Sequence, residues 1–209
     1  SDNRLELTTN SISLNAPRRN LFYQMQMHNS KLYTCGGGLF YIPYYNPGTI
    51  QVMDSNGDWQ IYQEEGIVEA TGVKRYGDIA SIAIDPYDEN HLFAASSLFG
   101  VYEFQDGKFV NLFTPKNSTI KPDYRYETTI YPNGVKFDSE GNLWILCAGA
   151  TNAISIYTKE KKWISLHHKN FSQKETLRGT FFDSRGWMWA VTPHFDYNGV
   201  FMLNTNGTL

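Results

Sequence analysis

Residues 134–166 read GVKFDSEGNLWILCAGATNAISIYTKEKKWISL, and the fold class can be inferred from this segment. Its first apolar residues alternate up to Asp138, a tight turn follows, and a second apolar segment carries Trp144. Alternation with a period of two predicts half-buried strands, and the Asp, Gly and Asn between the two segments predict a turn. With a third strand from Ile154 and a fourth from Trp163, the stretch predicts a unit of four antiparallel strands.

The same plan occurs in two further copies, at residues 81–113 and 179–209. In every copy the first strand ends at an aspartate and the second strand carries an aromatic residue; the pairs are Asp85 with Phe93, Asp138 with Trp144, and Asp183 with Trp189. The copies recur at about 45–55 residues, which is close to the period of a propeller blade. The last copy stops at the turn signal Asn206-Gly207 and lacks its outer strand.

A more divergent copy precedes these three, and a glycine-rich insertion, GGGLFYIPYYNPG from Gly36, interrupts it. The predicted blades cover residues 21–66, 76–116, 130–168 and 177–209. The sequence therefore predicts an all-β fold of about four propeller blades, each of four antiparallel strands, with the last blade incomplete. We interpret the chain as a fragment of a larger propeller. The polar segments 64–78 and 115–129 are predicted to cross the surface as linkers.

Composition agrees with many short strands and excludes several partners. Aromatic residues make up 15% of the 209 residues, the formal net charge is -3, and no Lys/Arg run could neutralise a phosphate backbone. We therefore expect no nucleic-acid partner. No apolar run reaches the length of a membrane helix, and the N-terminus has no signal peptide, so the protein is either cytoplasmic or has lost a signal. Cys35 and Cys147 fall in different repeats, which argues against a disulfide between them.

The repeated aspartates Asp85, Asp138 and Asp183 have two interpretations. They could form a ring of carboxylates for acid–base chemistry or cation binding. An Asp two or three residues before Gly or Asn is favoured in turns because its side chain binds nearby backbone N–H groups. We expect turns, and thus single substitutions that cost stability rather than an activity. No histidine pair has metal-ligand spacing and no nucleophile elbow occurs, so we expect no catalytic residue, metal or cofactor.

Aromatic residues in two predicted loops are the candidate ligand-binding residues. They are Tyr41, Tyr44 and Tyr45 in the first insertion, with Trp187, His194 and Tyr197 in the last blade. Flat rings at the mouth of a propeller can stack on sugar faces, and neighbouring amides can bond hydroxyl groups. The alternative is that these rings fill gaps between blades, as Phe93, Trp144 and Trp189 are expected to do.

The string DSEGNLW from Asp138 resembles the repeat of two-component-regulator propellers. The counterpart DSRGWMW from Asp183 departs from it, because Trp187 replaces the asparagine. The stretches YNPGTIQVMDSNGDW from Tyr45, DPYDENHLFAASSLFGVYEFQDGKFV from Asp85 and GVFMLNTNGTL at the end are similar to the PorZ-like branch of type IX secretion.

This resemblance, over about residues 22–209, implies an extracytoplasmic propeller of the cell surface or periplasm. In the PorZ-like branch it implies a surface protein that helps to attach secreted cargo to anionic lipopolysaccharide, so a glycan, lipopolysaccharide or envelope-protein partner is expected. In the regulator branch it implies the periplasmic sensing domain of a hybrid histidine kinase. Since the repeat residues are structural in the family, the resemblance transfers no catalytic site.

Overall fold

The computed structural model describes residues 15–38, 45–193 and 198–206, and these residues form four small antiparallel sheets. Each sheet is one predicted blade, and its strands pair in sequence order. Blade 1 contains β1 (Gln24–His28), β2 (Lys31–Cys35), β3 (Ile50–Met53) and β4 (Trp59–Ile61). Blade 2 contains β5 (Ile79–Asp85), β6 (Asp88–Ser96), β7 (Gly100–Gln105) and β8 (Lys108–Phe113). Blade 3 contains β9 (Pro132–Phe137), β10 (Leu143–Cys147), β11 (Ile154–Tyr157) and β12 (Trp163–Leu166).

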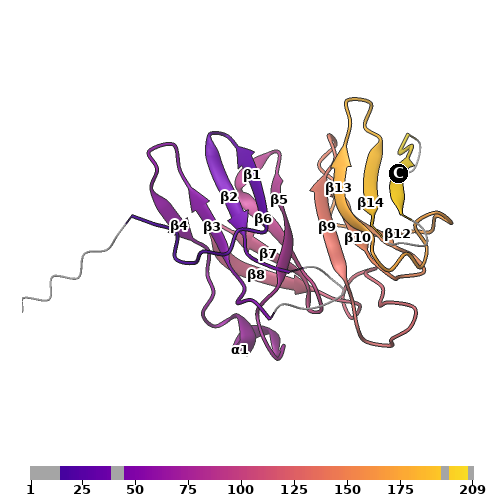
Figure 1. Cartoon of the computed structure of the whole chain (residues 1–209), viewed down its shortest axis with the longest axis horizontal. Coiled ribbons are helices and arrows are strands. Elements are labelled where there is room, and N and C mark those ends of the chain that lie inside the picture. Colours follow the sequence, from indigo (N-terminus) through magenta and orange to yellow (C-terminus); the bar gives the residue numbers. More distant parts are fainter. Residues whose placement is uncertain (1–14, 39–44, 194–197, 207–209) are drawn as a thin grey trace, which may run out of the picture.

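Blade 4 has three strands among the described residues, namely β13 (Arg178–Phe182), β14 (Met188–Thr192) and β15 (Gly199–Leu203). The blades follow one another across the molecule in sequence order (Figure 1), and consecutive inner strands β1, β5, β9 and β13 are neighbours. The all-β propeller fold predicted from the repeats is therefore confirmed.

Turn chemistry fixes the register of the hairpins. Asp106 and Gly107 both have positive φ, 51° and 70°, which is the conformation of the tight turn predicted between β7 and β8. Asn56 donates its backbone N–H to Asp54 Oδ1 at 2.8 Å in the turn between β3 and β4. Because these turns are local, the alternating strands on either side pair in one register.

The hydrophobic core lies between the blades in three clusters, one at each interface. Large rings on the second strands fill it. Tyr33 of blade 1, Phe93 of blade 2 and Trp144 of blade 3 are at most 2% exposed, and each faces the next blade. The packing predicted for Phe93 and Trp144 is thus confirmed. The packing predicted for Trp189 is not observed. Trp189 lies on the face of blade 4 that is turned away from blade 3, and on that face it stacks on exposed Phe181.

One predicted linker contains a helix that the sequence reading missed. Helix α1 (Ile67–Thr71) lies between blades 1 and 2, and its Ile67 is fully buried against blades 1 and 2. Gly66 and Gly72 flank it with φ of 77° and 68°, left-handed values that glycine adopts without a steric penalty. Within the described ranges no helix is long and apolar enough to span a membrane.

Candidate functional site

The blade topology separates two ends of the molecule. The hairpin end carries the turns between the first and second strands and between the third and fourth strands of each blade. The linker end carries the loops between second and third strands and the linkers from one blade to the next, including α1 (Figure 1). A site built from loops of several blades has to lie at one end or the other.

The two predicted aromatic residues that the structure describes lie at opposite ends. Tyr45 is in the loop between β2 and β3, at the linker end, and Trp187 is in the β13–β14 turn, at the hairpin end. Tyr41, Tyr44, His194 and Tyr197 lie outside the described residues. Tyr45 and Trp187 therefore do not belong to one binding site.

Tyr45 forms part of an ordered platform at the linker end. Its side chain is 70% exposed, and the Arg75 guanidinium carbon lies 4.9 Å from its ring centroid. Arg75 donates to Asp78 Oδ2 at 2.6 Å, and the Asp78 carboxylate is fully buried. The second oxygen of Asp78 accepts the backbone N–H of Asn46 at 3.0 Å. A buried carboxylate thus holds the guanidinium, and the guanidinium holds an exposed ring.

A second platform of the same construction lies in the linker between blades 2 and 3. Asp123 is buried and receives two hydrogen bonds from the Arg125 guanidinium, at 2.8 and 2.7 Å. Glu175 binds the same guanidinium at 2.8 Å. The Arg125 guanidinium carbon lies 5.6 Å from the Tyr124 ring centroid and 5.3 Å from that of Tyr126, and these rings are 50% and 49% exposed.

Electrostatics make this second platform rigid. Burial opposes ionisation of Asp123, but the hydrogen bonds and charge of Arg125 hold the pKa of Asp123 below its usual range. The hydrogen bond to Asp123 raises the pKa of Arg125. The ion pair is therefore permanent at physiological pH, and the two tyrosine rings are presented on a fixed support.

Sequence reading missed Tyr124 and Tyr126, although a signal was present. The linker reads Pro-Asp-Tyr-Arg-Tyr from Pro122, and alternating aromatic and basic residues are unusual in a solvated connector. A cavity of about 430 Å³ adjoins the rings, and its other lining residues include Lys121, Thr151 and Asn152. Exposed rings beside amide, hydroxyl and ammonium groups can stack on a sugar ring and bond its hydroxyls.

The aspartates at the hairpin end serve the turns, as predicted. Asp85 Oδ1 accepts the N–H of Tyr87 at 2.9 Å, Asp138 Oδ1 that of Glu140 at 3.0 Å, and Asp183 Oδ1 that of Arg185 at 2.9 Å. The turn at Trp187 keeps this pattern without the asparagine, since the N–H of Trp187 also donates to Asp183 at 3.1 Å. Trp187 itself packs under the Arg185 guanidinium, 3.9 Å from its carbon.

The two cysteines lie in different blades. Cys35 and Cys147 are unpaired and fully buried, and burial raises the pKa of both thiols to about 12. In the part of the chain that the structure describes, no group of three His, Cys, Asp or Glu side chains is placed to hold a metal ion.

No protein-family model and no curated protein matches this chain in sequence. Among solved structures it is similar to PorZ, described as an essential bacterial surface component of the type-IX secretion system of Porphyromonas gingivalis. The TM-score is 0.84 and the identity 21%, over 94% of this chain and 27% of PorZ. It is also similar to the extracellular domain of a putative one-component system from B. thetaiotaomicron (TM-score 0.60, identity 14%, covering 89% of this chain and 23% of that one).

A gluconolactonase from Xanthomonas campestris has a TM-score of 0.55 at 14% identity, over 86% of this chain and 55% of the enzyme. The chain thus spans about a quarter of the first two structures and about half of the third. At these identities the likeness shows the fold. The resemblance of the repeats to PorZ-like and regulator propellers is confirmed at that level: this chain has the β-propeller fold of PorZ and of the extracellular domain of a putative one-component system.

Proposed function

We propose that this chain is part of an extracytoplasmic propeller that binds an envelope glycan, without catalysis, through the tyrosine platforms at its linker end. The observation that carries the proposal is the second platform, where Tyr124 and Tyr126 flank Arg125 and are about half exposed. Exposed rings on a buried ion pair bind with little loss of side-chain entropy, because the support is ordered before the ligand arrives.

The proteins with a similar fold support this role. PorZ, which has the same fold, is described as a bacterial surface component, and a surface location would bring the linker end into contact with envelope polysaccharide. The likeness to an extracellular domain of a one-component system supports the alternative, a sensory input domain in which ligand binding shifts an equilibrium. Sequencing the gene on both sides of this chain separates the two roles, since a membrane helix followed by signalling motifs supports the sensor.

Glycan binding is tested by titrating lipopolysaccharide, with tyrosine and tryptophan fluorescence as the readout. We expect the double variant Tyr124→Ala, Tyr126→Ala to bind about tenfold more weakly or worse, because stacking on each ring contributes about 1 kcal/mol. Tyr87→Ala is the matched control, since Tyr87 is 63% exposed and lies at the hairpin end. Equal affinity in the double variant and the control would refute the proposed site.

A further inference from the structure

A cavity of about 500 Å³ lies between blades 2 and 3 at the hairpin end, away from the tyrosine platforms. Its volume is within the range of small-molecule sites. The side chains that line it include acidic residues on blade 2, aromatic residues at the interface and basic residues on blade 3; they are Asp85, His91, Glu103, Phe93, Phe137, Tyr157, Lys159 and Lys161.

The blade-2 wall departs from the repeat at one position. In blade 3, Trp144 pairs with Ile156 across the second and third strands, and in blade 4 Trp189 pairs with Met202. The corresponding pair in blade 2 is Phe93 with Glu103. A carboxylate therefore stands where the other copies have an apolar side chain, and only 14% of it is exposed. Departures of this kind from a repeated pattern are expected at functional positions.

His91 lies between the Glu103 carboxylate and the turn aspartate Asp85 and contacts both. Its Nδ1 lies 3.0 Å from Asp85 Oδ2, and its Nε2 lies 2.9 Å from Glu103 Oε1. A neutral imidazole has one N–H, so both contacts are favourable only when the ring is protonated. Two carboxylates and one imidazolium leave this wall with a net negative charge.

The opposite wall is positive and does not neutralise it. Lys159 and Lys161 lie on the turn between β11 and β12 of blade 3, and Lys159 Nζ is 4.6 Å from the Tyr87 ring centroid. Within the described ranges no ion pair joins either lysine to Asp85 or Glu103. The two charged walls therefore face the same cavity without forming ion pairs with each other.

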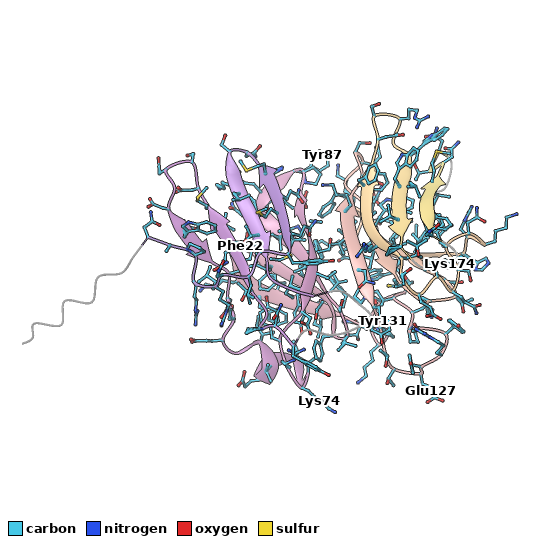
Figure 2. All side chains as sticks on the ribbon, in the orientation of Figure 1. Phe22, Lys74, Tyr87, Glu127, Tyr131 and Lys174 are labelled. Carbon is cyan, nitrogen blue, oxygen red and sulfur yellow. The ribbon has the colours of Figure 1, made fainter. Side chains whose placement is uncertain are left out.

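Tyr87 lies across the boundary of the two blades at this cavity. Its hydroxyl donates to the Ser139 carbonyl oxygen at 2.8 Å, and a Cβ at Gly141 would lie 2.8 Å from its ring. Figure 2 shows Tyr87 at the hairpin end, between the strands of blade 2 and those of blade 3. The cavity is therefore bounded by both blades and by this ring.

We propose that the cavity binds a small zwitterion of the α-amino-acid type. Its ammonium group lies at the carboxylates of blade 2, its carboxylate at the lysines of blade 3, and its side chain against Phe137 and Tyr157. A ligand with both charges completes the ion pairs that the two walls cannot make with each other, and the rings receive its apolar part.

The test uses L-leucine as the probe, with isothermal titration and thermal shift as the readouts. N-acetyl-L-leucine lacks the cation, L-leucinamide lacks the anion, and glucose is a neutral polyol. We expect L-leucine to bind at least about tenfold more tightly than each of the three, because each lacks at least one charge-assisted contact.

Variants test the walls separately. Glu103→Gln is expected to weaken L-leucine binding about tenfold or more. The double variant Lys159→Gln, Lys161→Gln is expected to weaken it by the same factor. Both lysines are exposed, so their substitution does not endanger folding. Glu69→Gln, on the exposed surface of α1, is the matched control and is expected to bind as the parent does. Absence of L-leucine binding at about 10 mM, equal binding of glucose, or unchanged affinity in the lysine variant would overturn the proposal.

Discussion

At the scale of single residues, one hydrogen bond recurs in the turns of blades 3 and 4. Asp138 Oδ2 accepts the indole N–H of Trp144 at 2.8 Å, and Asp183 Oδ2 accepts that of Trp189 at 3.0 Å. In blade 2 the second-strand aromatic is Phe93, which has no donor, and His91 supplies the hydrogen bond to the aspartate. The hydrogen bond to the turn aspartate is therefore donated by an indole, which does not titrate, in blades 3 and 4, and by the imidazole of His91, which does titrate, in blade 2.

Blade 2 should consequently lose stability at high pH. Burial alone would lower the pKa of His91, but hydrogen bonds to Glu103 and Asp85 raise it above its usual value. The folded state thus holds the proton more tightly than the unfolded chain. The resulting stabilisation is fully present below a pH of about 6.5 and is lost as the pH rises through the folded-state pKa. We expect the free energy of unfolding of the parent, relative to His91→Gln, to fall over this window in urea titrations.

Acidic and basic side chains surround His91. The charged groups that face His91 come from every packed element: Asp85 from β5, Asp88 from β6, Glu103 from β7, and Lys159 and Lys161 from the β11–β12 turn. His167→Gln, at an exposed position, controls for the loss of any histidine. A parent and His91→Gln that respond identically to pH would show that the ring stays neutral.

The candidate site was only partly predictable from such residues. Aromatic residues in loops led to the prediction of Tyr45, which is exposed and supported by Arg75, and its role in binding stays a prediction. Grouping it with Trp187 was wrong, because strand direction places their loops at opposite ends of the blades. The Pro-Asp-Tyr-Arg-Tyr string was a signal for Tyr124 and Tyr126, but the contacts of Glu175 with Tyr124 and Arg125 were not predictable, because Glu175 is remote in the sequence.

At the scale of elements, the hairpins were predictable and the linkers were not. Alternation and turn residues act over a few positions, so they identify β9 and β10 without knowledge of the rest of the chain. Helix α1 has five residues, too few for a helical period to show, and it is held by burial of Ile67 in the interface of blades 1 and 2. Its cause is tertiary packing, which a single pass along the sequence does not contain.

The contact between blades 1 and 2 depends on a glycine in the loop after β2. Gly37 donates its N–H to the carbonyl of Ile79 at 2.8 Å, and a Cβ at Gly37 would overlap the backbone of Ile79. Because Ile79 belongs to the inner strand β5, the loop cannot move away without shifting that strand. We expect Gly37→Ala to lower the free energy of unfolding by about 2 kcal/mol, measured in urea.

The exposed turn residue Ser139 offers the comparison for this prediction. Ser139→Ala also places an alanine in a loop, but its side chain is exposed, so a change within about 0.5 kcal/mol is expected. If Gly37→Ala were equally mild, the two blades would have enough freedom to separate locally, and the close approach of Gly37 to Ile79 would not contribute to their packing.

At the scale of the whole molecule, each blade buries its apolar face against the next one. Blades 1, 2 and 3 do so through the three core clusters. Part of the other face of blade 1 is covered, since the side-chain amide of Gln51 exchanges hydrogen bonds with the backbone of Arg19 at 2.8 and 3.0 Å. Gln51 is 1% exposed as a result. Met25 and Met27, on the same face of blade 1, are 63% and 64% exposed, so both ends of the stack carry exposed apolar side chains.

The outer face of blade 4 has no such cover among the described residues. Phe181, Val200 and Met202 are 49%, 63% and 43% exposed, and Phe181 stacks on Trp189 with the ring planes 6° apart. A contiguous apolar face of this kind favours association. We expect sedimentation velocity to show self-association of the 209-residue chain with rising concentration. The variant Phe181→Ser, Met202→Ser should remain monomeric with a nearly unchanged melting temperature, because both side chains are exposed.

Val110→Ser distinguishes this face from exposed apolar surface in general, since Val110 is 54% exposed on the outer strand β8 of blade 2. Its association should match that of the parent, because a single apolar side chain among polar neighbours does not form a patch. If Val110→Ser suppressed association as strongly as the blade-4 variant, the attraction would reside in the outer strands. If the parent stayed monomeric at every concentration, the exposed apolar face of blade 4 would not be sufficient for association.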